Sequence, residues 1–190
     1  MKKIETEVKL EVSAKEFLDC QQLLQESGFT EKPAYNLKDY FFNVEAFDAA
    51  GWNFLRIREY DGTRYERTEK IWKYNENGDR VRLEDERETD KSELDSLCAT
   101  NKTPLTLTKV RTNYEGVVLG YSAVFSFDYV TFPDEKRYFV ECEIDVPEDV
   151  AGDEFRSKLR EWMLRFFNLS VRPEGIGMMA LTLSKLGTSV

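Results

Sequence analysis

The segment Ile4-Glu5-Thr6-Glu7-Val8-Lys9-Leu10-Glu11 decides the fold, because charged and apolar residues alternate along it. Successive side chains of a β-strand point to opposite faces of the sheet. A strand over this segment therefore gathers its charged side chains on one face: Glu5, Glu7, Lys9 and Glu11. Taken alone, the segment also fits an ordinary half-exposed strand whose charged face is merely solvated.

The same alternation returns in segments that lie far apart in the sequence. Glu141-x-Glu143-x-Asp145 is a second acidic row, and the residues between and around it are almost wholly apolar. Two segments carry positive charge at the same spacing, Arg56-x-Arg58 and Lys109-x-Arg111. Asp128 lies on the polar side of another alternating segment. The charges are thus sorted by strand and by face.

Alternation and turn residues predict a chain that is mainly β. We expect strands over 3–12, 35–43, 53–60, 64–74, 79–89, 104–113, 116–130 and 137–146. Turns are expected at Asp61-Gly62, Asn77-Gly78-Asp79 and Glu115-Gly116. Helical periodicity favours helices over 14–27, 91–99, 153–168 and 177–186, the first with Ser13 as N-cap and Glu16 at the capping-box position. Short antiparallel strands with few helices are typical of a barrel or a curled sheet.

Composition narrows the class of protein. A chain of 190 residues, 41% hydrophobic and 33% charged, fits one soluble domain with a sizeable core. It has no apolar run long enough for a bilayer and no apolar signal segment before the first strand, so we expect a cytoplasmic protein without a membrane partner. A net charge of -9 argues against nucleic acid as a partner.

The chain has no histidine, which excludes Ser-His-Asp and Cys-His nucleophilic sites and the usual catalytic zinc ligands. Its three cysteines, Cys20, Cys98 and Cys142, lack metal-ligand spacing and are expected to be buried as small apolar residues. The catalytic chemistry that remains possible uses carboxylates, lysine, arginine, tyrosine or a metal ion.

A closed barrel of about eight strands fills its interior with side chains or holds one small ligand. If the apolar faces pack under the helices, the charged rows turn toward a shared interior, where unpaired charges are strongly destabilising. A water-filled tunnel that accepts a metal-bound polyphosphate resolves this, because carboxylates bind the hard cation and basic residues bind phosphate oxygens.

In these residues the chain resembles the CYTH superfamily, the triphosphate tunnel metalloenzymes, which include class IV adenylyl cyclases, thiamine triphosphatases and inorganic triphosphatases. The matching motifs are, in order, Glu5-x-Glu7-x-Lys9, Lys38-Asp39-Tyr40-Phe41-Phe42, Leu55-Arg56-Ile57-Arg58, Thr68-x-Lys70, Arg82-x-Glu84-x-Glu86, Lys109-x-Arg111, Asp128 and Glu141-x-Glu143. The resemblance implies a single domain over residues 1–190, folded as an eight-stranded antiparallel β-tunnel with a few flanking helices. The chain departs from the family at its end, where no Lys-Ser-Tyr-like motif is visible in residues 175–185.

The resemblance also implies roles for individual residues. Mg²⁺ or Mn²⁺ would be held by Glu5, Glu7, Glu141 and Glu143, with Asp128 and Glu86 as further acidic candidates. The triphosphate would be bound by Lys9, Arg56, Arg58, Lys70, Lys109 and Arg111. The catalytic set would be Glu5, Glu7, Lys9 and Glu143.

Some assignments stay open. Lys70 and Lys73 have opposite parity, and Lys70 is favoured for the tunnel because it shares a face with Thr68. Asp39 could simply cap a turn. Lys185 is either an exposed helix residue or a C-terminal phosphate ligand, and Arg82, Glu84 and Glu86 are either site residues, a solvated hairpin face or a salt-bridge ladder.

The expected function is metal-dependent hydrolysis of a triphosphate, either inorganic triphosphate or a small organic or nucleoside triphosphate. The first alternative is a class IV adenylyl cyclase, in which the ribose 3′-hydroxyl attacks the α-phosphate and releases pyrophosphate. The second is a non-catalytic module that binds polyphosphate or nucleotide. Aromatic edge strands could also join two copies into a homodimer.

Overall fold

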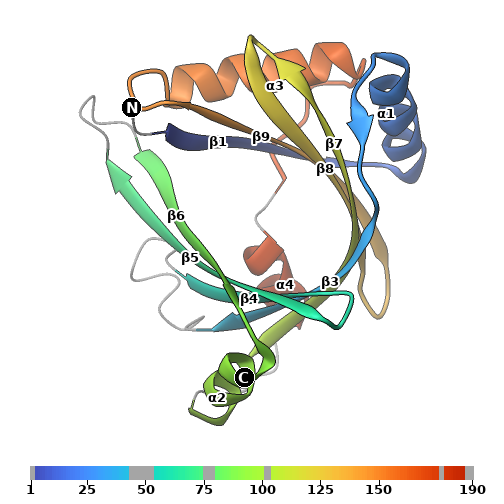
Figure 1. The fold of residues 1–190 in the computed structure, drawn as a ribbon. Helices are drawn as coiled ribbons and strands as arrows, with labels where there is room; N and C mark the ends of the chain where they lie inside the picture. Colours follow the sequence, from blue (N-terminus) through green and yellow to red (C-terminus); the bar gives the residue numbers. More distant parts are fainter. Residues whose placement is uncertain (1–2, 43–53, 75–79, 101–103, 176–177, 187–190) are drawn as a thin grey trace. The chain divides into compact units, whose positions relative to one another are not determined.

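The computed structural model describes residues 3–42, 54–74, 80–100, 104–175 and 178–186 (Figure 1). Residue contacts divide the chain into two compact units. The first comprises Met1–Ala34, Tyr74–Val81 and Val110–Gly175, and the second comprises Tyr35–Lys73, Arg82–Lys109 and Ile176–Val190. Each unit is assembled from separate stretches of sequence, and a single domain over residues 1–190 stays a prediction.

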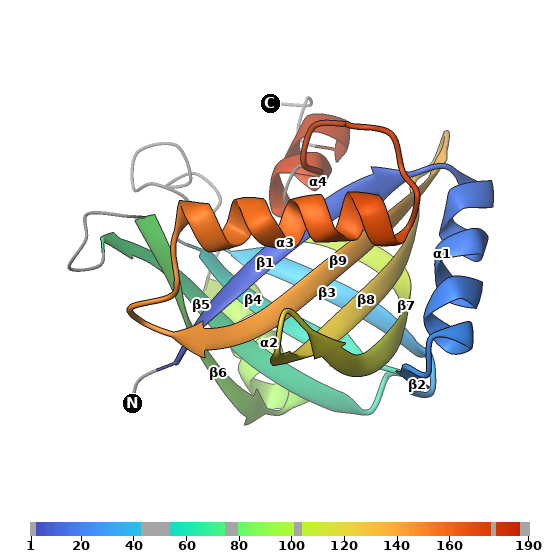
Figure 2. The same cartoon turned by 90° about the horizontal axis from the view of Figure 1, so that it is seen from above.

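The first unit is a sheet with two helices on one face. Its strands hydrogen-bond in the order β1-β9-β8-β7, and β2 adds to β7. The bounds are β1 Lys3–Val12, β2 Thr30–Glu31, β7 Leu105–Val118, β8 Tyr121–Thr131, β9 Lys136–Pro147, α1 Ala14–Glu26 and α3 Asp153–Phe166, with β7 entering this unit from residue 110 onward. Both helices contact β1, and Figure 2 shows α3 lying across β1 and β9.

Alternation along the strands builds the core of the first unit. Val8 is fully buried beneath the helices, and so is Phe125 on β8. Phe127 packs edge-on against Phe17 of α1 at 5.2 Å between ring centroids, and Phe125 packs against Phe167 just after α3 at 5.6 Å. Since the helices take the apolar face of the sheet, the charged residues of β1 and β9 lie on the opposite face.

The second unit is a sheet with the strand order β7-β3-β4-β5-β6. The bounds are β3 Tyr35–Phe42, β4 Phe54–Tyr60, β5 Arg64–Tyr74, β6 Arg80–Thr89, α2 Lys91–Thr100 and α4 Met178–Leu186. One face packs on α2 through a cluster formed by Phe42, Leu55, Ile57, Tyr65 and Leu94. Because Arg56 and Arg58 alternate with Leu55 and Ile57 along β4, both arginines lie on the other face.

The predicted fold class is confirmed: the chain is mainly β, an antiparallel sheet with few helices. All four expected helices are present, with ends within two residues of the prediction. The capping box is also confirmed, because the Ser13 hydroxyl accepts from the Glu16 amide at 3.2 Å while the Glu16 carboxylate accepts from the Ser13 amide at 2.8 Å.

At the β4–β5 turn, Asp61 and Gly62 have φ of 49° and 74° as a tight turn requires. The Asn77-Gly78-Asp79 turn lies outside the described residues.

One predicted turn is wrong. Chain reversal between β7 and β8 occurs at Leu119 and Gly120, with φ of 52° and 86°, and not at Glu115-Gly116. Gly116 lies within β7, where a Cβ atom would come within 2.2 Å of the Phe29 ring. The glycine therefore makes room for Phe29. Val117, two residues before Leu119, is 67% exposed.

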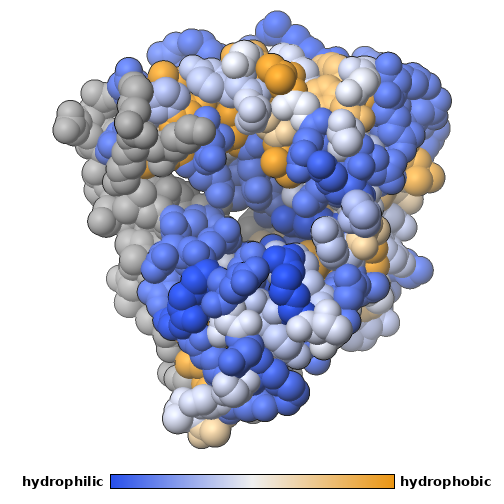
Figure 3. Space-filling model, viewed as in Figure 1, coloured by the Kyte–Doolittle hydropathy of each residue, from blue (hydrophilic) through white to orange (hydrophobic). Residues whose placement is uncertain are grey.

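Three further observations concern the helices, the surface and the cysteines. None of the described helices is both long and apolar enough to cross a membrane. Figure 3 shows hydrophilic residues over most of α1, as expected for a helix that buries only one side. The predicted burial of the cysteines holds for Cys20 and Cys142 but is wrong for Cys98, which is exposed near the end of α2.

Candidate functional site

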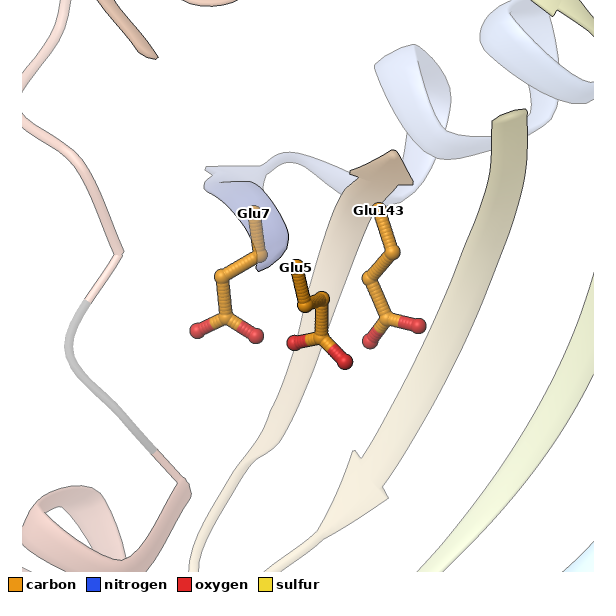
Figure 4. Close-up of side chains that lie close together, drawn as sticks. All are labelled: Glu5, Glu7 and Glu143. Carbon is orange, nitrogen blue, oxygen red and sulfur yellow. The ribbon is translucent and has the colours of Figure 1, made fainter. Parts of the chain in front are cut away.

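Three glutamates of the first unit converge on one point. Glu5, Glu7 and Glu143 each place a carboxylate oxygen within 4.8 Å of the other two (Figure 4). Glu7 and Glu143 are directly opposite in the antiparallel β1–β9 pair, and Glu5 is two residues earlier on the same face. All three are half-buried. We call these residues the acidic group.

The donors of the acidic group fit a hard divalent cation. Carboxylate oxygens are the ligands that Mg²⁺ and Mn²⁺ prefer in proteins. Like charges directly opposite each other destabilise a sheet, so the pairing of Glu7 with Glu143 favours a bound cation between them. Partial exposure leaves such a cation accessible to substrate.

A largely buried ion network lies on the same face. Lys9 Nζ is 2.8 Å from Glu141 Oε1 across the β1–β9 pair. Arg111 of β7 donates two bonds of 2.7 Å to the Asp128 carboxylate, from Nε and Nη2, and a third of 3.1 Å to Glu141. Asp128 and Glu141 are both buried. We call Lys9, Arg111, Asp128 and Glu141 the ion network.

Electrostatics keep both basic members of the ion network charged. Burial alone would lower the pKa of Lys9, but Glu141 and Glu7 outweigh it and raise the pKa above its usual value. The same balance raises the pKa of Arg111, chiefly through Asp128. Lys9 is therefore suited to stabilise negative charge and not to act as a general base.

The predicted metal ligands separate into two sets in the structure. Glu5, Glu7 and Glu143 come together, whereas Glu141 and Asp128 each bind basic side chains of the ion network. The role of these two residues as metal ligands stays a prediction.

The second unit contains another group of charges, formed by Arg56, Arg58, Lys109 and Asp39. Arg58 donates to both Asp39 oxygens, at 2.7 Å from Nε and 3.0 Å from Nη2. Lys109 Nζ is 3.8 Å from the same carboxylate. Arg56 Nη2 donates to the Thr68 hydroxyl at 2.7 Å. We call these residues the Asp39 group.

Glu86, another predicted metal ligand, belongs to the second unit. Its carboxylate accepts from Thr68 at 3.1 Å and from Arg56 at 3.4 Å, and its side chain is 47% exposed. Glu84 is half-buried on the same strand, and the side chain of Arg82 lies outside the described part. Arg82, Glu84 and Glu86 were expected to be site residues, a solvated hairpin face or a salt-bridge ladder. Of these three residues, Glu86 forms an ion pair with Arg56.

The register of β5 bears on the two lysines. Thr68 is opposite Arg56 and Lys70 is opposite Phe54, so the backbone of Lys70 has the parity of Thr68 as expected. The side chains of Lys70 and Lys73 lie outside the described part. Lys185 is exposed on α4.

From the sequence alone, Asp39 could simply cap a turn. The structure places it inside β3, opposite Arg58 and buried. Its signal in the sequence was a lone carboxylate between Leu37 and Phe41 on one face of a strand.

Buried cysteines offer no reactive thiolate, because burial raises the pKa of Cys20 to about 12 and that of Cys142 well above its usual value.

Comparisons with known proteins bear on the family and the fold. Residues 3–170 match the model of the CYTH domain. A structure from Hippeastrum, described as an adenylyl cyclase candidate that reveals a dominant triphosphatase activity, is 19% identical with a TM-score of 0.66 and covers 96% of each chain. A Pyrococcus horikoshii structure is 22% identical with a TM-score of 0.67, covering 95% of this chain and 99% of the other.

A Bacillus halodurans structure, described as an adenylate cyclase candidate, is 19% identical with a TM-score of 0.61 and covers 95% of this chain and 98% of the other. At these identities the likeness establishes the fold alone. No curated protein matches the sequence.

Proposed function

Because the chain belongs to the CYTH domain family, we propose that it hydrolyses a triphosphate, inorganic or small organic, with the help of a divalent cation. The observation that supports this most strongly is the acidic group beside the ion network. Three carboxylates lie within 4.8 Å of one another, and two residues after Glu7 the half-buried Lys9 has a raised pKa. A cation and a polyanion are the ligands that such a pair of charge groups can bind.

In this proposal Glu5, Glu7 and Glu143 hold Mg²⁺ or Mn²⁺. A divalent ion at this position would neutralise charge on the phosphate oxygens and act as a Lewis acid. The three side chains come from two adjacent strands of one sheet, so their positions are fixed by backbone pairing and not by a loop.

Lys9 and Arg111 are proposed to bind phosphate oxygens in the first unit. Both carry fixed positive charge, and both are anchored to buried carboxylates that orient them. Arg56, Arg58, Lys70 and Lys109 are proposed as further phosphate-binding residues, on the resemblance to the family.

The reaction itself needs little covalent help from the protein. Water attacks the terminal phosphorus, the bridging P–O bond breaks, and phosphate and diphosphate leave. Phosphoryl transfer of this kind depends on positioning and on neutralising charge at the leaving oxygen. Lys9 is suited to this second task because its ammonium group is held by Glu141 and its pKa is raised above the usual value.

The test is to identify products from purified protein with Mg²⁺ or Mn²⁺ and one of three substrates: tripolyphosphate, ATP or thiamine triphosphate. Free phosphate released only when the metal is present supports the proposal. Cyclic AMP and pyrophosphate from ATP would establish the cyclase instead. Binding of tripolyphosphate without turnover of any substrate would leave a non-catalytic module.

A further inference from the structure

Asp39 is an unexpected residue to find next to the basic residues that are proposed to bind phosphate. It lies within β3, is fully buried, and accepts two hydrogen bonds from Arg58. Lys109, which is only 2% exposed, places its Nζ 3.8 Å from the same carboxylate. A carboxylate here weakens the positive potential that a polyanion would meet, so its presence needs an explanation.

The charge balance of the Asp39 group explains how the residue is tolerated. Burial by itself would raise the pKa of the Asp39 carboxyl, but Arg58, Lys109 and Arg56 together lower it well below its usual range. The carboxylate therefore stays ionised at neutral pH. Asp39 in turn supplies negative charge next to two buried cations, Arg58 and Lys109.

We propose that Asp39 is a positioning residue, an internal counter-anion that holds Arg58 and Lys109 in place and limits how tightly they bind a polyphosphate. This inference rests on the proposed function. Its two bonds with Arg58 occupy two of the five N–H donors of the guanidinium and so fix the orientation of that side chain. A limited affinity lets the charged products leave.

A counter-anion and a merely structural carboxylate respond differently to substitution. If Asp39 only fills space and makes hydrogen bonds, Asp39→Asn lowers stability equally with and without ligand. If it is a counter-anion, the substitution destabilises the free protein, and a bound polyphosphate then restores the missing negative charge. Binding becomes tighter, because the ligand no longer competes with a fixed carboxylate for the same cations.

The experiment measures tripolyphosphate binding to the full chain by calorimetry without added divalent metal, together with the melting temperature with and without ligand. Wild type is compared with Asp39→Asn and with the control Asp61→Asn. Asp61 undergoes the same chemical change in the exposed β4–β5 turn, where its carboxylate accepts from Asn36. Asn also tolerates the positive φ at that position.

For Asp39→Asn we expect a lower melting temperature in the free protein, a larger rise on adding tripolyphosphate, and a Kd lower on the order of tenfold. The control should bind as wild type does. An unchanged or weaker Kd in Asp39→Asn overturns the inference while leaving the proposed function intact, whereas failure of wild type to bind tripolyphosphate counts against both. If Asp39→Asn is insoluble alone, recovery of folded protein in tripolyphosphate is expected, and absence of recovery refutes the inference.

Discussion

Replacing Asp128 by alanine should destabilise the protein substantially. Asp128 is fully buried on β8, and Arg111 donates two bonds of 2.7 Å to its carboxylate. Alanine removes this acceptor and leaves a guanidinium that is only 9% exposed. Arg111 keeps one carboxylate, because its 3.1 Å bond to Glu141 remains.

The size of the effect follows from this geometry. Removing one partner of a buried ion pair typically costs about 3–5 kcal/mol. The remaining bond to Glu141 places Asp128→Ala at the lower end, so we expect the free energy of unfolding to fall by about 3 kcal/mol. Many domains are stable by only about 5–15 kcal/mol, so such a loss is readily measured.

Urea unfolding monitored by circular dichroism gives the required free energies. Asp19→Ala is the matched control, because Asp19 pairs with Lys15 on the surface of α1, where both side chains are more than half exposed. Exposed pairs contribute about 1 kcal/mol or less. If Asp128→Ala costs no more than this control, the ion network is not the stabilising element described above.

Two other substitutions test separate parts of the fold. Gly116→Ala should lower the free energy of unfolding by about 2 kcal/mol in the same urea assay, because its Cβ would displace the Phe29 ring; wild-type stability would show that Phe29 is not held against β7. Arg172→Gln tests the Glu16 carboxyl, whose pKa falls from 4.5 to about 2 mainly through its hydrogen bond with Arg172. Stability from a depressed carboxyl pKa is present above pH 4.5 and lost toward pH 2. Arg172→Gln should therefore be less stable than wild type at pH 7, with about 1 kcal/mol of the difference due to Glu16 after allowance for solvent screening. The difference should shrink toward pH 2, where only the lost bonds from Arg172 to the Glu11 and Ser170 oxygens still contribute. A difference that does not vary with pH would contradict this linkage.

The sequence predicted the faces of the strands better than the partners of individual side chains. Alternation over β1 and β9 was enough to place Glu5, Glu7 and Glu143 on one face, since strand geometry fixes which side chains share a face. It could not predict that Asp128 binds Arg111, because that contact depends on the β7–β8 pairing and its register. Local pattern does not encode register.

The misplaced turn has a similar origin. Glycine next to a polar residue often indicates a turn, and Gly116 directly follows Glu115. Its actual role is set by Phe29, which is distant in sequence and fills the space beside β7. The true turn contains Leu119 at positive φ, a conformation that is uncommon for leucine and therefore not expected from sequence.

Hydrolysis of tripolyphosphate by wild type and by Glu143→Gln, measured as phosphate release with Mg²⁺ or Mn²⁺, tests the central claim most directly. Glu154→Gln serves as control, since Glu154 pairs with Lys158 on the exposed side of α3. We expect wild type and control to release phosphate at similar rates and Glu143→Gln to be slower by about a hundredfold, as for the loss of one transition-state-stabilising group. Equal rates in all three proteins would show that the acidic group is not the centre of the reaction.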